Sequence, residues 1–185
     1  MSRLQYTMLC SLDGYIADAD GGYAWAEPDP EVHAFVNEVE RPVGTYLYGR
    51  RTYETMAVWQ TIGGPGHPAV ENDYADIWRA ADKIVYSTTL AQVSTPRTRL
   101  ERALDPEGVR RLLAGSALDV GIGGAALAVP LLRAGLVDDV RQFLHPVVVG
   151  GGTPGLPDGV RLDLELVDER RFAGGVVYLH HRARG

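Results

Sequence analysis

Apolar residues recur at helical spacing in several segments of the chain. One apolar face, with members at i, i+3, i+4 and i+7, comprises Val32, Phe35, Val36 and Val39. Asp29 suits the N-cap of this helix and Pro30 its first position. The same pattern starts a second helix at Asp105, and Gly115 ends it. Further helices are predicted over Arg50–Met56, along the apolar positions of 70–81, and over Ala125–Ala134 with a kink at Pro130.

Short runs of apolar residues between these helices predict strands. The runs cover Leu4–Cys10, Val43–Tyr48, Lys83–Tyr86, Leu118–Ile122, Val140–Val149, Leu162–Val167 and Val176–His181. Strands and helices alternate until the last two strands, which follow each other directly and join near Gly174 and Gly175. This order predicts an α/β fold with a mostly parallel sheet and an antiparallel strand at the C-terminus. Ligands of such sheets bind beyond the carboxyl ends of the strands, so the segments there are the candidates for function.

Composition narrows the class of protein. A chain of 185 residues with 45% hydrophobic and 23% charged residues predicts one globular domain, over 1–185. A net charge of −6 argues against nucleic-acid binding. The single cysteine, Cys10, excludes an internal disulfide, a cysteine-based metal site and the zinc signature of a nucleobase deaminase; no metal is expected. The N-terminus lacks the apolar core of a signal peptide, and the uncharged run 120–132 is too short to cross a bilayer, so we expect a cytoplasmic protein.

Four segments that follow strands carry residues suited to a phosphorylated ligand. Gly123–Ala126 and Gly49–Thr52 each open a helix, where unpaired N–H groups and the helix dipole favour phosphate. Arg50 and Arg51 add guanidinium groups that match phosphate oxygens, and the Ser87–Thr89 segment adds hydroxyls. The fourth segment is 11–17. Together they favour a dinucleotide with an additional phosphate, and hence NADPH before NADH.

Two other interpretations of these segments stay open. For any one segment alone, glycines that end strands and arginines that are solvated are the favoured interpretation; the four segments together favour a ligand. The run 121–126 also fits the G-x-G-x-x-A fingerprint of a Rossmann fold. Asp138 and Asp139, however, precede the next strand, whereas the ribose-binding acid of a Rossmann fold follows it.

Several motifs, taken in order, resemble the dihydrofolate reductase-like superfamily. They are SLDGYIAD, YLYGRRTYETM, KIVYSTT, VGIGGAALA and LVDDVRQFLHPVVVGGGTPGLP, followed by VDERRF and GVVYLHHR. The chain is most similar to the reductase domain of the bifunctional riboflavin-biosynthesis deaminase-reductase and its stand-alone bacterial relatives. The resemblance covers nearly the whole chain. It implies a three-layer fold with a mixed sheet of about eight strands, NADPH as hydride donor, and a homodimer.

The resemblance also implies roles for individual residues. Gly49, Arg50, Arg51 and Thr52 would hold the adenosine phosphates, with Ser87 and Thr88 at the adenosine, and Gly123, Gly124, Ala125 and Ala126 around the pyrophosphate. Ile16 and Ala17 would line the nicotinamide, under a mobile loop that contains Trp25. The superfamily further implies a cis peptide bond between Gly123 and Gly124, which two residues without a Cβ make less costly.

The resemblance implies a catalytic acid on the first helix. Glu31 matches it best, with Phe35 one turn on at the substrate; Asp29 is the alternative, although N-capping already explains it. Helix-dipole stabilisation alone would equally explain an acid at Glu31. Asp13 is the second catalytic candidate, because it would organise the turn after the first strand. His145, at the end of another strand, would lie on the substrate side.

The chain also departs from true dihydrofolate reductases. The run 126–128 lacks the aromatic residue expected there, and Phe143 replaces the threonine that supports the acid. The sequence therefore favours an NADPH-dependent reductase that transfers hydride to a C=N or C=O carbon of a small heterocyclic or ribosylamino substrate. By resemblance the substrate would be the phosphoribosylamino-pyrimidine of riboflavin biosynthesis. Dihydrofolate reductase activity and a non-catalytic nucleotide- or pterin-binding module are the alternatives.

Overall fold

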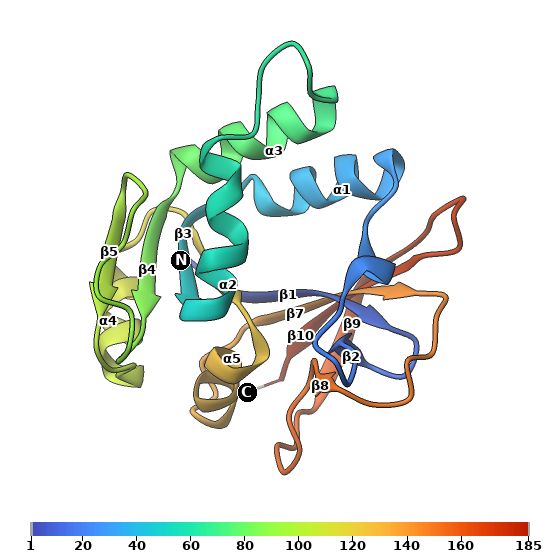
Figure 1. The fold of residues 1–185 in the computed structure, drawn as a ribbon. Coiled ribbons are helices and arrows are strands. Elements are labelled where there is room, and N and C mark those ends of the chain that lie inside the picture. Colours follow the sequence, from blue (N-terminus) through green and yellow to red (C-terminus); the bar gives the residue numbers. More distant parts are fainter. Residues whose placement is uncertain (1, 185) are drawn as a thin grey trace.

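The computed structural model describes residues 2–184, and an eight-stranded sheet forms its middle layer (Figure 1). The strands in spatial order are β5 (Thr98–Glu101), β4 (Asp82–Tyr86), β3 (Val43–Gly49), β6 (Asp119–Gly123), β1 (Leu4–Ser11), β7 (Asp139–His145), β10 (Val177–Ala183) and β9 (Leu164–Arg171). Neighbouring strands from β5 to β7 run parallel, and β10 runs antiparallel to both β7 and β9. The predicted fold class is therefore confirmed.

Helices cover both faces of the sheet. They are α1 (Pro30–Glu40), α2 (Arg50–Met56), α3 (Ala69–Ala80), α4 (Pro106–Gly115) and α5 (Ala125–Arg133), with short 3-10 turns η1 (Ala24–Ala26) and η2 (Ala57–Gln60). Figure 1 shows α1, α2 and α3 on one side of the sheet and α4 and α5 on the other. The predicted caps form, because Asp29 accepts a hydrogen bond from the Val32 N–H and Asp105 accepts from Glu107 and Gly108.

Side-chain alternation along β1 divides the core into two clusters. Tyr6 and Met8 face the cluster beneath α4 and α5, whereas Leu9 packs against the cluster beneath α1 and α3. Thr7 alternates to the same face as Leu9. The face of β1 that α1 covers therefore carries both an apolar side chain, Leu9, and a polar one, Thr7.

Some boundaries differ from the prediction. The strand expected over Val140–Val149 ends at His145, because Pro146 has no N–H to continue the ladder. The polar strand β5 was not predicted, nor was the small antiparallel pair of β2 (Tyr15–Ala17) and β8 (Thr153–Pro154). The polar strand β5 and the two-residue strand β8 have no apolar pattern of their own, and the three residues of β2 are too few to show one.

Candidate active site

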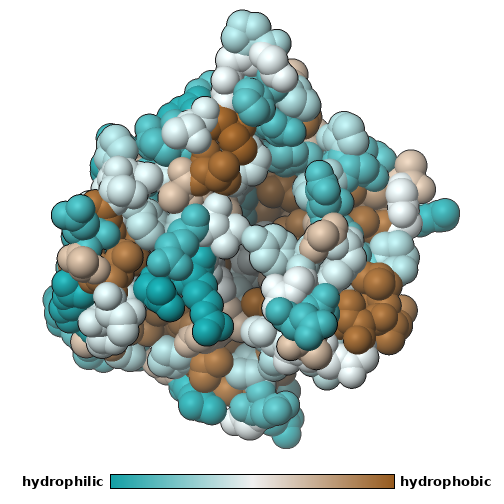
Figure 2. All heavy atoms as spheres, viewed as in Figure 1, coloured by the Kyte–Doolittle hydropathy of each residue, from teal (hydrophilic) through white to brown (hydrophobic). Residues whose placement is uncertain are grey.

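A cavity of about 700 Å³ opens where β3 and β6 end. Figure 2 shows this face hollowed near its centre, with apolar side chains visible inside the hollow. Its lining includes ten of the twelve residues predicted to bind a cofactor: Ile16, Ala17, Gly49, Arg50, Arg51, Thr52, Gly123, Gly124, Ala125 and Ala126. The structure thus brings together three of the four segments identified in the sequence.

The turns after β3 and β6 interlock at the mouth of this cavity. A Cβ on Gly124 would lie 2.6 Å from Thr52 Oγ1, and one on Gly123 would lie 2.5 Å from the Tyr48 ring. Gly124 has a φ of 98°, which other residues rarely adopt. The predicted cis bond between Gly123 and Gly124 is wrong: the bond is trans, and the positive φ of Gly124 redirects the chain from strand to helix instead.

The two helices that begin at this mouth have no capping side chain. Gly49 and Gly124 occupy the N-cap positions of α2 and α5, in contrast to the aspartates that cap α1 and α4. The first N–H groups of α5 therefore stay available to a ligand. Arg50 pairs with Glu54 at 3.5 Å, while no salt bridge found in residues 2–184 involves Arg51. The arrangement offers uncapped N–H groups and a guanidinium on one rim.

The opposite rim is a pair of loops joined through backbone. Ile16 and Ala17 belong to β2, which pairs with β8. Gly152 lies so close that a Cβ there would be 2.1 Å from the Ala17 carbonyl oxygen. The Gly155 N–H donates to the Gly14 carbonyl, and the Gly155 carbonyl accepts from the buried Tyr6 hydroxyl. The glycines of 150–155 thus allow close approach to the chain's own backbone.

Ser87 and Thr88 follow β4 at the same edge of the sheet but do not line the cavity. The Ser87 hydroxyl accepts hydrogen bonds from the N–H groups of Thr89 and Leu90, so it stabilises its own turn. Thr88 is exposed. Both residues are next to the end of β3, where Gly49 pairs with Tyr86.

The two catalytic candidates lie outside the cavity. Glu31 Oε2 accepts a hydrogen bond from the Ala173 N–H at 3.1 Å, and Glu31 Oε1 lies 3.6 Å from Arg170. Asp13 holds the other rim, accepting from the N–H groups of Val149 and Gly150. Hydrogen bonds from Ser11 and from those N–H groups lower the pKa of Asp13. Asp13 does organise the turn after β1, as the resemblance implies.

Two of the predicted substrate residues, Trp25 and His145, lie near each other but do not line the cavity. Trp25 and His145 meet edge to face, with ring centroids 6.2 Å apart. Trp25 Nε1 and His145 Nε2 are both buried without a hydrogen-bond partner. Burial lowers the pKa of His145, although the charge of Asp29 opposes this. The neutral imidazole is therefore favoured.

The floor of the cavity contains polar residues that the sequence analysis did not single out. Thr7, Glu40 and Tyr46 all line it. Glu40, the last residue of α1, is only 7% exposed. Burial raises the pKa of its carboxyl group, and the Thr7 and Tyr46 hydroxyls and the Arg141 guanidinium act to lower it. Glu40 comes four residues after Val36, so the 3.6-residue period of the helix places it on the same buried face. This spacing is the feature of the sequence from which its burial could have been predicted.

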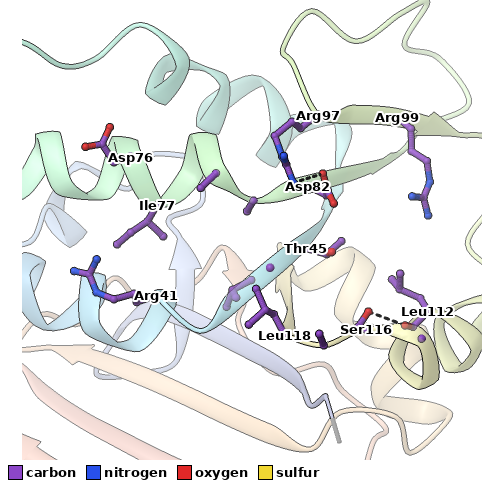
Figure 3. Close-up of a pocket in the computed structure, with 16 residues that line it drawn as sticks. Arg41, Thr45, Asp76, Ile77, Asp82, Arg97, Arg99, Leu112, Ser116 and Leu118 are labelled. Atoms are coloured by element: carbon purple, nitrogen blue, oxygen red, sulfur yellow. Dashed lines mark hydrogen bonds and ion pairs between the residues drawn. The ribbon is translucent and has the colours of Figure 1, made fainter.

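A second hollow, of about 660 Å³, lies at the opposite ends of the parallel strands. Figure 3 shows three arginines at its border, Arg41, Arg97 and Arg99. Each is paired with an acid: Arg41 with Asp73, Arg97 with Asp82 and Arg99 with Glu101. Its cationic groups are thus neutralised within the protein, and it lies away from the carboxyl ends of the strands. The first cavity is therefore the better candidate.

The chain matches a known protein family over nearly its whole length. The model of the RibD C-terminal domain matches residues 2–178. The chain belongs to the RibD C-terminal domain family. It is also 29% identical, over 187 aligned residues, to the uncharacterized protein YyaP of Bacillus subtilis (strain 168), an alignment that covers 99% of this chain and 96% of YyaP. The resemblance inferred from the motifs is confirmed.

Solved structures share the fold of this RibD C-terminal domain. A putative riboflavin biosynthesis protein from Shewanella sp. PV-4 matches with a TM-score of 0.76 and 20% identity, over 100% of both chains. A diaminohydroxyphosphoribosylaminopyrimidine deaminase/5-amino-6-(5-phosphoribosylamino)uracil reductase from Thermotoga maritima matches with a TM-score of 0.65 and 18% identity. That match covers 99% of this chain and 57% of that one. At these identities the comparison establishes the architecture.

This RibD C-terminal domain uses Phe35 and Phe143 in its core. The Phe35 ring lies near Phe143, Phe172 and Tyr178, with centroid distances of 6.2, 5.4 and 4.9 Å. The Arg170 guanidinium covers the other side of the Phe35 ring at 4.8 Å. Phe143, which the resemblance aligns with a supporting threonine, is thus part of an aromatic cluster. No helix within 2–184 has the length and apolar character needed to cross a membrane.

Proposed function

We propose that this chain is an NADPH-dependent reductase of small heterocyclic or ribosylamino substrates, with 5-amino-6-(5-phosphoribosylamino)uracil as the first substrate to test. The observation that carries the proposal is the cavity into which the starts of both α2 and α5 open without capping side chains. Membership in the RibD C-terminal domain family and the reductase named for the Thermotoga relative support the same activity.

The residues at the mouth fit a pyridine dinucleotide. The N–H groups of Ala125 and Ala126 would hold its pyrophosphate, since Gly124 leaves them uncapped and adds no side chain. Arg51, with support from Arg50, would bind the additional phosphate of NADPH. Ile16 and Ala17 would face the nicotinamide from the opposite rim. When bound, NADPH supplies a hydride for the reduction.

The protein's own contribution is position and exclusion of water. The cavity wall is mainly apolar and includes Leu9, Val36 and Met56. Such a wall removes water from the space between two bound reactants and fixes their relative geometry. Close packing of Thr52 against Gly124 would help to hold that geometry, because it leaves no room for a side chain between the two turns.

The test is NADPH oxidation, followed at its absorbance band, with 5-amino-6-(5-phosphoribosylamino)uracil and separately with dihydrofolate. Turnover of the pyrimidine supports the proposal, whereas turnover of dihydrofolate alone would favour a dihydrofolate reductase. NADPH binding without oxidation across a broad panel of heterocycles would indicate a binding module. Gly124→Ala should abolish NADPH binding, whereas Gly115→Ala, at a site where a Cβ meets nothing within 4 Å, is the matched control.

A further inference from the structure

A group of buried oxygen atoms lies beneath α1, apart from the cofactor mouth. Thr7 Oγ1, Glu40 Oε1 and Tyr46 Oη are each buried without a well-formed hydrogen bond, although the two hydroxyls lie close enough to the Glu40 carboxyl group to lower its pKa. The three residues come from β1, the end of α1 and β3, and all three line the cavity. Unsatisfied buried polar atoms are uncommon in proteins, and three together on one cavity wall require a specific reason.

A glycine of β6 leaves room above the sheet for the Tyr46 side chain, next to Thr7 and Glu40. Gly121 pairs with Gln5 of β1 on one side and with Tyr46 of β3 on the other. A Cβ at Gly121 would lie 3.0 Å from Tyr46 Cδ1, so the tyrosine ring can lean over β6 only because this residue is glycine. The Tyr46 ring stacks on Tyr48 with an interplanar angle of 6°. Glycine in β6 thus turns the face of the sheet into a shallow hollow with an aromatic wall.

The carboxyl group of Glu40 is costly in this position. It is nearly buried, and no salt bridge within residues 2–184 uses it. Burying a polar or charged group without a full set of hydrogen bonds destabilises a protein by about 1–3 kcal/mol or more. The nearest cation, Arg141, is engaged with the Gln5 side chain. A buried carboxyl group that lowers the stability of the protein and faces a cavity is characteristic of a binding site.

We propose that Thr7, Glu40 and Tyr46 form the recognition site for the hydrogen-bonding edge of the substrate, a neutral planar heterocycle with neighbouring N–H and C=O groups. Both hydroxyls can donate and accept, and the carboxyl group accepts from an N–H or, when protonated, donates to a carbonyl or ring nitrogen. The aromatic wall of Tyr46 and Tyr48 suits a flat ring. This proposal rests on the proposed function and names the residues that select its substrate.

The alternative to a recognition site is a structural polar cluster, and stability separates the two. If the cluster supports the fold, then Glu40→Gln and Glu40→Leu lower the free energy of unfolding. If the cluster binds a ligand, these changes remove the unfavourable free energy of burying the Glu40 carboxyl group. The free energy of unfolding then stays the same or rises, while ligand affinity falls. Glu38→Gln is the matched control, because Glu38 is an exposed acid on the same helix.

The experiment measures binding of 6-aminouracil and of 5-amino-6-(5-phosphoribosylamino)uracil by calorimetry, in the intact protein with and without NADPH. We expect Glu40→Leu to weaken both probes by at least about tenfold, with smaller losses for Thr7→Val and Tyr46→Phe. NADPH affinity should change less than about twofold, since none of the three residues is among those proposed to hold NADPH. Glu38→Gln should match the unmodified protein.

The outcomes distinguish this inference from the proposed function. Probe affinities unchanged by Glu40→Leu and Glu40→Gln would overturn the recognition site, even if the protein oxidises NADPH. So would an unmodified protein that binds neither probe. Probe binding that depends on Glu40 in a protein that does not oxidise NADPH would uphold the recognition site and reject the reductase.

Discussion

The Glu31 carboxylate accepts a hydrogen bond from the backbone N–H of Ala173, in the turn between β9 and β10. This contact joins the start of α1 to the C-terminal hairpin, and Arg170 lies beside it. The acid implied by the family pattern is therefore engaged with the protein's own backbone. The hydrogen bond connects two elements of secondary structure, and Glu31 does not line the cavity.

Glu31→Ala should lower the free energy of unfolding by about 0.5–1.5 kcal/mol, the net value of one hydrogen bond. The maximal rate of NADPH oxidation should stay the same, because Glu31 does not line the cavity. Denaturant unfolding and steady-state kinetics check both parts. A large loss of rate at unchanged stability would restore Glu31 as the proton donor.

Gly124→Ala should destabilise the protein by about 1–3 kcal/mol, because alanine strains the backbone at a φ of 98°. The new Cβ would also meet Thr52 Oγ1. Adding Thr52→Ala should recover part of the loss, since it removes the contact but not the strain. Thermal unfolding of the single and double variants measures this, and strictly additive losses would contradict the interlocking of the two turns.

Arg51→Ala should weaken NADPH binding more than NADH binding, because a guanidinium forms strong charge-assisted hydrogen bonds with a phosphate. Arg50→Ala should have a smaller effect, since Arg50 is already paired with Glu54. Titration of each variant with both cofactors measures the selectivity. Arg99→Ala, in the other hollow, is the control; equal losses for NADPH and NADH would remove Arg51 from the phosphate site.

Lys83 predicts a dependence of stability on alkaline pH. Its Nζ donates to the carbonyl oxygens of Trp78 and Ala81, and burial, aided by the Arg97 charge, lowers its pKa to about 8. The unfolded value is about 10.4, so between these values the folded state releases the proton first and stability gains with rising pH. Relative to Lys83→Met, the free energy of unfolding should rise from about pH 8 to 10.

The comparison with Lys83→Met removes the effect of the buried tyrosines. Burial raises the pKa of Tyr6 and Tyr74, so the folded state resists their ionisation and both proteins lose stability above about pH 10. Urea unfolding at several pH values gives the difference between the two proteins. A difference that is flat from pH 8 to 10 would show that Lys83 titrates normally.

The edge strand β9 is the place where we expect the predicted homodimer to form. It pairs only with β10 in the described sheet, and Leu166 and Val167 are 50% and 43% exposed. Light scattering should give a dimer, and Leu166→Lys should shift it towards the monomer because a charge opposes strand addition. A monomer at high protein concentration would reject the expectation.

Local signals predicted the fold well because they act through neighbouring residues. The caps at Asp29 and Asp105 and the helical spacing of α1 depend only on local geometry, and they appear as expected. The glycine turn at Gly124 was also located from its residues. Its trans bond was not, because the backbone conformation that makes the turn depends on contacts with Thr52 of α2, which lies far away in the sequence.

The floor of the site could not be predicted in the same way. A glutamate at the end of a helix is ordinarily solvated, and Glu40 is buried because α1 crosses the central strands at this point. Tyr46 reaches it because Gly121, on a strand far along the chain, has no side chain. The arrangement of Glu40 and Tyr46 depends on three segments that are far apart in the sequence, so no short sequence pattern predicts it.

The rim that carries Ile16 and Ala17 is tied to the loop around Gly152 and Gly155 by strand pairing and by the Gly155–Gly14 hydrogen bond. Ligand entry on that side therefore requires both loops to move as one body. Their backbone amides should then exchange with solvent water at a common rate, and a bound ligand should slow that exchange in both loops by the same factor. Two stretches that are far apart in the sequence thus form a single kinetic unit.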